Sequence, residues 1–168
     1  MAASLELFAQ HGVGGTSLQM IAEELGVTKA AVYHQFNTKD AIVIAAAENE
    51  LARVEMVLDE AEAKASPTLQ RDALLEGIVD LCVRRRATVS VILSDPVVLR
   101  AFATHEQYQS VVDRFTSLLW GPDPAVDGHL RTVMFMAALS GAVMHPLLAD
   151  LDEELLRSQL LRLAQSIR

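Results

Sequence analysis

Side chains that could carry out catalysis are spread thinly along this sequence. The five histidines lie at positions 11, 34, 105, 129 and 145, and the single cysteine, Cys82, lacks neighbours at metal-ligand spacing. No nucleophile elbow, phosphate-binding loop or HExxH helix is present. Asp123, Asp127 and His129 are close in sequence, but the prolines at positions 122 and 124 indicate a surface loop. The sequence therefore predicts a protein that is not an enzyme, with no metal ion and no cofactor.

The middle of the chain carries aromatic, sulfur-containing and histidine side chains. Such residues can line a pocket for an apolar small molecule because they adapt to irregular shapes. They are equally suited to an ordinary hydrophobic core, and the sequence leaves both roles open. The candidate pocket residues are Cys82, Phe102, His105, Tyr108, Phe115 and Met134.

Composition favours a soluble protein inside the cell. Of the 168 residues, 51% are hydrophobic, yet no apolar run approaches the length of a membrane helix. The N-terminus lacks the pattern of a signal peptide, and one cysteine fits the reducing cytoplasm. An apolar excess without membrane spans is typical of chains that bury surface against another subunit. We therefore expect a cytoplasmic protein that forms oligomers.

Net charge is the strongest argument against nucleic-acid binding. The chain carries −8, and residues 1–48 hold two lysines and five acidic residues, a net charge of −3. Because duplex DNA repels acidic surfaces, any DNA binding must depend on a few well-placed donors, doubled in a dimer.

Every boundary in the sequence is a helix boundary, so the predicted fold class is all-α. Thr16 with Gln19 and Asp150 with Glu153 have the spacing of capping boxes, and Thr28, Thr38 and Ser66 are predicted N-caps. Apolar residues recur with helical spacing and never alternate over a useful length. The predicted helices are 1–11, 17–24, 28–35, 38–64, 67–86, 88–93, 96–119 with a break near 104, 127–145 and 152–167.

Residues 12–39 form the most informative stretch. Residues 17–24 and 28–35 are short helices joined by a turn at Gly26, where a side chain would strain the backbone. This is the geometry of a helix-turn-helix, and the small residues Ala30 and Ala31 suit a helix that enters the DNA major groove. A plain helical hairpin within a bundle has the same pattern, so geometry alone leaves DNA reading open.

The residues of this stretch resemble the N-terminal domain of tetracycline-repressor (TetR) family regulators. The resemblance covers residues 1–45, about a quarter of the chain, and beyond it only the helical layout is similar. It rests on agreement in order and spacing at Leu7-Phe8-Ala9, His11-Gly12, Thr16-Ser17, Ile21-Ala22, Leu25-Gly26-Val27-Thr28, Val32-Tyr33-His34, Phe36 and Lys39.

The resemblance implies roles for individual side chains. Phe8 and Phe36 would hold the three helices together. Hydroxyl, cationic and imidazole groups would contact phosphates or base edges from the helix starts and the recognition helix. The DNA-binding residues so implied are Thr16, Ser17, Thr28, Lys29, Ala30, Tyr33, His34 and Lys39.

Two further expectations follow from the resemblance. Family members usually begin with a longer first helix, often preceded by a basic segment, and this sequence starts inside that helix; whether such an arm precedes Met1 stays open. Small residues in 127–145 and the amphipathic 152–167 resemble the family's dimer interface. The candidate interface residues are Ala137, Gly141, Met144, Leu156, Leu160 and Leu163.

The predicted organisation is a DNA-binding domain at 1–47, with the helix-turn-helix at about 17–36, and an effector-binding and dimerisation domain at 48–168. The predicted function is a sequence-specific DNA-binding regulator, a repressor released from its operator by an apolar or amphipathic small molecule. Its predicted partners are double-stranded operator DNA, the effector and a second copy of itself. The alternative is a helical dimeric ligand-binding or adaptor protein that does not read DNA.

Overall fold

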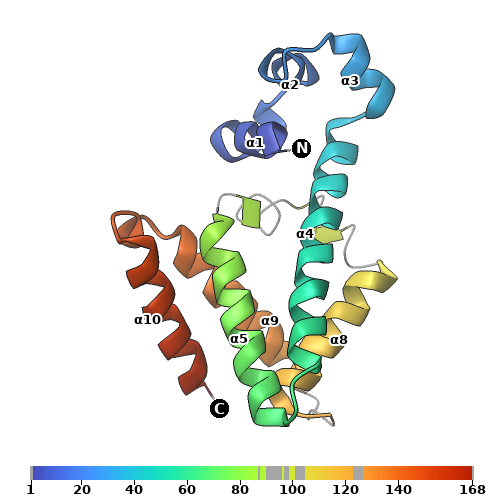
Figure 1. Ribbon diagram of the computed structural model, residues 1–168. Helices are drawn as coiled ribbons and strands as arrows, with labels where there is room; N and C mark the ends of the chain where they lie inside the picture. The colour runs from blue at the N-terminus through green and yellow to red at the C-terminus, as the bar shows by residue number, and fades with distance from the viewer. Residues whose placement is uncertain are drawn as a thin grey trace. The chain divides into compact units, whose positions relative to one another are not determined.

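The computed structural model describes residues 2–86, 105–122 and 127–167, together with 88, 89, 96, 99 and 100. Every regular element with bounds in these ranges is a helix, so the all-α prediction is confirmed (Figure 1). The chain divides into two compact units, and the boundary falls within one helix, between Glu50 and Leu51. Most of the helix predicted at 88–93 and of the first part of 96–119 lies outside the described residues.

The N-terminal unit contains α1 (Ala2–Gly15), α2 (Leu18–Glu24), α3 (Lys29–Gln35) and the first half of α4 (Lys39–Glu62). Gly12 and Gly26 have φ values of 71° and 64°, a backbone conformation that favours glycine. Gly12 kinks α1, which continues to Gly15 beyond its predicted end.

Short polar side chains begin the helices of this unit, with one correction to the prediction. Thr28 and Thr38 accept hydrogen bonds from the N–H groups of Ala31 and Ala41, as predicted for N-caps. The helix after Gly15 is capped by Ser17, whose Oγ accepts from the N–H of Met20, so the capping box predicted from Thr16 is wrong. Gln19 donates instead to Glu23, on the following turn.

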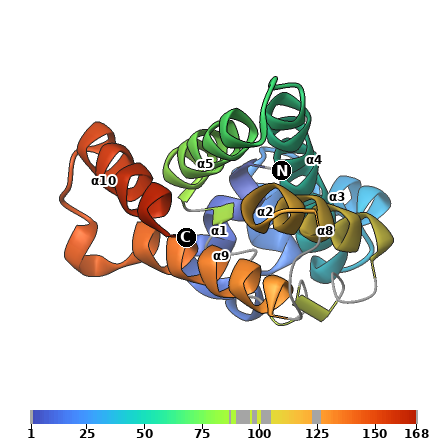
Figure 2. The same ribbon diagram turned by 90° about the horizontal axis from the view of Figure 1, so that it is seen from below.

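The second unit consists of the second half of α4, α5 (Pro67–Arg84), α8 (Glu106–Trp120), α9 (Gly128–Met144), the short 3₁₀ turn η1 (Pro146–Leu148) and α10 (Glu153–Ser166) (Figures 1 and 2). Ser66 caps α5 with Pro67 in its first turn, as predicted. Asp152 caps α10 through the N–H groups of Glu154 and Leu155, so the box predicted from Asp150 is wrong.

A continuous apolar core holds the second unit together. Leu58 of α4, Leu74 and Ile78 of α5, and Phe115 of α8 are almost fully buried, and the Phe115 and Phe135 rings lie 6.2 Å apart. α10 packs against α5, and α8 packs against both α5 and α9. At roughly 25 cal/mol for each Å² of apolar surface, this core is the main stabilising contribution to the unit.

A short polar seam fixes α8 against α9 within that core. The hydroxyls of Thr116 and Thr132 are hydrogen-bonded at 2.9 Å, and the Trp120 Nε1–H donates to Thr132 at 3.0 Å. Since buried polar groups are costly unless paired, these bonds restrict the two helices to one register. Within the described ranges, no helix has the length and apolar character needed to cross a membrane.

Candidate functional sites

The turn between α2 and α3 rests on a small apolar core. Leu18, Ile21 and Ala22 of α2 and Val32 of α3 are buried, in agreement with their apolar spacing. Leu25 is 43% exposed because it is the C-cap residue of α2, where the chain leaves the helix. The core is confined to one side of the two helices and leaves the other side of α3 free.

The two faces of α3 differ sharply. One face, with Ala31, Val32, Gln35 and Phe36, lines an apolar groove of about 230 Å³ within the N-terminal unit. The four residues of α3 that were predicted to touch DNA lie on the opposite face, and all four are exposed. These residues are Lys29, Ala30, Tyr33 and His34.

The exposed face of α3 is ordered by its own side chains. The Lys29 ammonium lies 5.6 Å from the centre of the Tyr33 ring, one helical turn away. The Tyr33 hydroxyl belongs to a side chain that is 45% exposed. This face therefore offers a cation, a phenol and an imidazole beside small Ala30, a combination suited to hydrogen-bonding with phosphates and base edges.

Ser17 and Thr28, both predicted to contact DNA, cap α2 and α3 and are exposed. Each uses an oxygen lone pair for its cap, which leaves the hydroxyl proton for an outside acceptor. Each of these hydroxyl groups can cap its own helix and at the same time donate a hydrogen bond to a phosphate oxygen.

Thr16 requires a correction. Its side chain is 1% exposed, and its hydroxyl donates inward to the carbonyls of Gly12 at 2.8 Å and Leu7 at 3.3 Å. Its backbone N–H also bonds to the Gly12 carbonyl. Thr16 therefore has no group available for the predicted phosphate contact, and its hydroxyl ties the kinked end of α1 together.

Lys39 has an unexpected structural role. Its ammonium donates to the carbonyls of Val13 and Gly14 at 2.9 and 3.0 Å. The last carbonyls of a helix lack intrahelical partners and attract cations. Lys39 thus satisfies the end of α1 from the first turn of α4, a contact that spans more than twenty residues and that the sequence analysis missed. Its predicted role in phosphate neutralisation stays a prediction.

The candidate pocket residues of the second unit do not form one site. Cys82 and Phe115 are each 2% exposed and belong to the continuous core, where burial raises the pKa of the Cys82 thiol to about 12. Met134 is 62% exposed on the outer face of α9, so its assignment to the pocket is wrong. Phe102 lies outside the described residues.

His105 and Tyr108 remain as the polar candidates for ligand binding. His105 is the N-cap residue of α8 but makes no capping bond, and its Nδ1 is buried without a hydrogen-bond partner among the described residues. An unpaired buried nitrogen costs about 1–3 kcal/mol. Tyr108 lies one turn along, half-buried, and burial raises the pKa of its phenol. The start of α8 therefore presents a polar atom that a ligand could satisfy.

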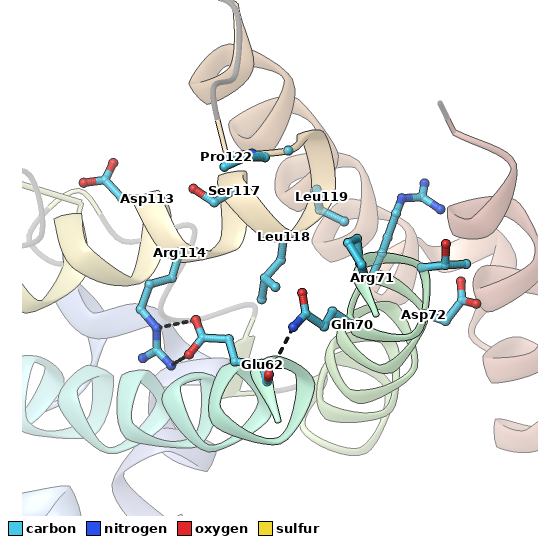
Figure 3. A pocket seen from close by; sticks show the side chains of 13 residues that line it. Glu62, Gln70, Arg71, Asp72, Asp113, Arg114, Ser117, Leu118, Leu119 and Pro122 are labelled. Atoms are coloured by element: carbon cyan, nitrogen blue, oxygen red, sulfur yellow. Dashed lines mark hydrogen bonds and ion pairs between the residues drawn. The ribbon is translucent and has the colours of Figure 1, made fainter. Parts of the chain in front are cut away.

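A cavity of about 890 Å³ lies elsewhere in this unit, at the end where α4 meets α5 (Figure 3). None of the predicted pocket residues lines it. Arg114 is held on its rim by a two-bond contact with Glu62, at 2.8 Å for each bond, and by Asp59 at 2.5 Å. Its lining residues are Glu62, Pro67, Thr68, Gln70, Arg71, Asp72, Asp113, Arg114, Ser117, Leu118, Leu119, Gly121 and Pro122.

The predicted dimer residues fall into two groups. Leu156 and Leu160 are 2% and 9% exposed and pack in the core of their own chain, so their assignment to a dimer interface is wrong. The remaining four are less buried, with Leu163 at 55% and Met144 at 39% exposed. A Cβ placed on Gly141 would meet nothing within 4 Å, as expected for a position that faces outward.

The exposed face of α9 is a continuous apolar stripe with helical spacing. It contains three large side chains and two small residues that permit close approach of another backbone. We call this set the α9 stripe; its members are Leu130, Met134, Ala137, Gly141 and Met144.

Comparison with known proteins places the N-terminal unit in a family. Residues 1–46 match the model of the bacterial regulatory proteins of the tetR family. The uncharacterised HTH-type transcriptional regulator YerO of Bacillus subtilis (strain 168) is 42% identical over 45 residues. That match spans 27% of this chain and 16% of YerO.

Solved structures match the whole chain in fold. The TetR-family regulator PfmR from Thermus thermophilus has a TM-score of 0.72 at 20% identity, over 99% of this chain and 97% of that one. The fatty acid degradation regulator FadR from Bacillus halodurans has a TM-score of 0.76 at 17% identity, over 99% and 92%. These structural matches show the fold, and the family match is confined to the first 46 residues. The model that residues 1–46 match is one of regulatory proteins, which agrees with the prediction that the chain is not an enzyme. The chain therefore resembles the tetR family of bacterial regulatory proteins in its first 46 residues, and it shares its fold with solved TetR-family structures.

Proposed function

We propose that the chain is a sequence-specific DNA-binding repressor, a cytoplasmic homodimer that leaves its operator when an apolar or amphipathic small molecule binds. The observation that carries the proposal is the exposed face of α3, with Lys29, Tyr33 and His34 around Ala30. It lies in the segment that matches the tetR-family model. The same match disfavours a dimeric adaptor without DNA reading, since an adaptor has no need of a helix-turn-helix.

Because the protein is acidic, its binding to DNA depends on the contacts of two N-terminal units acting together. Each N-terminal unit offers few cations, so a single unit binds weakly. Two units on successive major grooves, about 34 Å apart, share one binding event and double the contacts. In this proposal α3 enters the groove, while the hydroxyls of Ser17 and Thr28 donate to flanking phosphates.

The α9 stripe is the proposed centre of the homodimer, joined by Leu163 of α10. A second copy of the chain is the occupant that fits, because a symmetric DNA reader needs two heads related by a two-fold axis. Ala137 and Gly141 allow the partner backbone to approach, and Leu130 and Met134, each at least 60% exposed, provide apolar area.

The proposed effector site lies at the start of α8, where the unpaired Nδ1 of His105 and the half-buried Tyr108 provide a polar end beside the apolar core. A ligand with an apolar body and one hydroxyl or carboxyl group fits this arrangement. FadR of Bacillus halodurans, which shares the fold, is a regulator of fatty acid degradation. Oleic acid is therefore the first probe.

Selection of duplexes from a random-sequence library, with wild-type protein, tests DNA reading. We expect enrichment of one palindromic sequence. The double variant Lys29→Ala/His34→Ala should bind it at least about tenfold more weakly, because two contacts are lost in each head. Glu60→Ala, exposed on the distant half of α4, is the matched control. Failure to enrich any sequence would contradict the proposal.

Calorimetric titration of oleic acid, with and without the selected duplex, tests the effector. Binding should weaken about 5–150-fold when the duplex is present, the range typical of allosteric coupling. His105→Phe should weaken oleic acid binding, whereas Ser117→Trp, which fills the cavity of Figure 3, should not. Equal affinities with and without duplex would show that oleic acid is no effector, and sensitivity to Ser117→Trp alone would place the site in the cavity.

A further inference from the structure

Helix α4 belongs to both units of the chain. Residues 39–50 form part of the N-terminal unit, and residues 51–62 lie in the second unit. An α-helix is stiff along its axis, so the contacts that fix its second half also set the direction of its first half. The contacts that residues 51–62 make within the second unit can therefore influence the DNA-binding face of α3.

On one side, α4 is tied to α8 by long polar side chains. Gln107 Nε2 donates to Glu55 Oε2 at 2.8 Å, and Arg114 binds Glu62 and Asp59. The two bridges lie two turns apart on both helices, so α8 runs parallel to this half of α4. The Arg114 side chain is 29% exposed and its partners Asp59 and Glu62 are 70% and 42% exposed, so this bridge lies at the surface.

On another side, α4 meets α5 at a glycine. A Cβ placed on Gly77 would lie 2.6 Å from Cγ1 of Val57 and 3.3 Å from Cγ2. Carbon atoms in contact lie about 3.5–4.0 Å apart, so no side chain fits between the two helices here. Glycine inside a helix costs about 0.5–1 kcal/mol relative to alanine, and α5 carries one at this contact with Val57 of α4.

We propose that Gly77 and Val57 form a positioning pair that sets the place of α4 and thereby controls operator affinity from outside the DNA interface. This inference rests on the proposed function. Valine holds one side-chain rotamer in about nine of ten helical positions, so Val57 cannot readily turn away from an added methyl group. The methyl group separates α4 from α5, and the polar bridges to α8 adjust. The displaced α4 then carries its N-terminal half away from the spacing that two major grooves require.

The test is the affinity of Gly77→Ala for the duplex selected by the wild-type protein, measured by fluorescence anisotropy without any effector. We expect about a tenfold loss, within the range of allosteric couplings. Val57→Ala removes both atoms that the new methyl group meets, so Gly77→Ala/Val57→Ala should recover affinity to within about threefold of wild type. Glu76→Ala, an exposed neighbour on α5, should bind like wild type.

Recovery of DNA affinity in the double variant would show that Gly77→Ala acts by displacing α4 and not by lowering the stability of the protein. Should Gly77→Ala fail to fold, Val57→Ile extends the same side chain by one methyl group and should also lower affinity, with the glycine intact. A folded Gly77→Ala that binds within about twofold of wild type overturns the inference, as does a double variant that stays weak. If the wild-type protein selects no duplex, the proposed function fails first and this inference falls with it.

Discussion

The two halves of α4 belong to units that are held together in different ways. In the N-terminal unit, directional hydrogen bonds fix the short helices: the caps at Ser17, Thr28 and Thr38 and the Lys39 contacts with the end of α1. In the second unit, an apolar cluster spans α4, α5, α8, α9 and α10. Hydrogen bonds are directional, whereas the attraction between apolar groups is not.

This difference suits a regulator with a rigid reader and an adjustable body. A reading surface must present its donors within a few tenths of an ångström, and caps with short side chains do that with few residues. A body that changes state must have two packings close in free energy. The predictions below test that contrast, in order of decreasing effect.

The largest effect should come from placing a charge on either side of α10. Leu160→Arg buries a charge against α5 and should lower the free energy of unfolding by about 3–5 kcal/mol, which leaves the second unit unfolded or nearly so. Leu163→Arg places the same charge on the 55% exposed side. It should keep full helicity by circular dichroism but sediment as a monomer. A stable Leu160→Arg would refute the placement of α10, and a dimeric Leu163→Arg would refute the proposed interface.

Lys39→Met should destabilise the N-terminal unit by about 1–3 kcal/mol, because two carbonyls at the end of α1 lose their charged donor. Urea denaturation monitored by residue-resolved hydrogen exchange would locate the loss in α1. Lys29→Met is the matched control, since its exposed ammonium contacts only the Tyr33 ring among the contacts found in the described residues. Equal stabilities of the two variants would remove the structural role assigned to Lys39.

Cys82 gives the second unit a pH dependence. The thiol ionises near its ordinary pKa of 9.0 in the unfolded chain, but burial raises its pKa to about 12 in the core. The unfolded state loses its proton first, so the free energy of unfolding falls as pH rises through this window, by about 1.4 kcal/mol at pH 10. Cys82→Ala should be less stable than wild type at neutral pH, and the difference should shrink above pH 9. If the free energies of unfolding of wild type and Cys82→Ala differ by the same amount from pH 7 to 10.5, the raised pKa of the Cys82 thiol is contradicted.

The smallest effect concerns one oxygen atom on the exposed face of α3. Tyr33→Phe removes an exposed hydroxyl and keeps the ring beside Lys29, so stability should not change. Affinity for the selected duplex should fall by about 0.5–1.5 kcal/mol, roughly two- to tenfold, for a lost hydrogen bond. Unchanged affinity across a salt titration would move the phosphate contact away from this residue.

Local features of the fold could be predicted from sequence, and long-range ones could not. Thr28, Thr38 and Ser66 were predicted as caps because capping depends on residues three apart. Thr16 and Asp150 were wrong because each has a second capping residue nearby, Ser17 and Asp152, and only the backbone decides between them.

The errors in the second unit have a different physical origin. Apolar residues occupy two faces of α10, and helical periodicity does not say which face meets its own chain. The buried row is Leu156, Leu160 and Ala164, whereas Leu163 lies on the exposed face. Met134 was misplaced for the same reason. The Lys39 bonds to α1 join residues too far apart in sequence for any periodic pattern to reveal.

The tight approach at Gly77 has a consequence for protein engineering. Replacing a glycine inside a helix by alanine usually stabilises a protein by about 0.4–1 kcal/mol, and it is a standard choice for raising the melting temperature. At this position the new methyl group would stand 2.6 Å from Cγ1 of Val57, so the gain in helix propensity is set against a steric overlap between α4 and α5. A thermostability screen would have to treat Gly77 and Val57 as one unit and mutate them together.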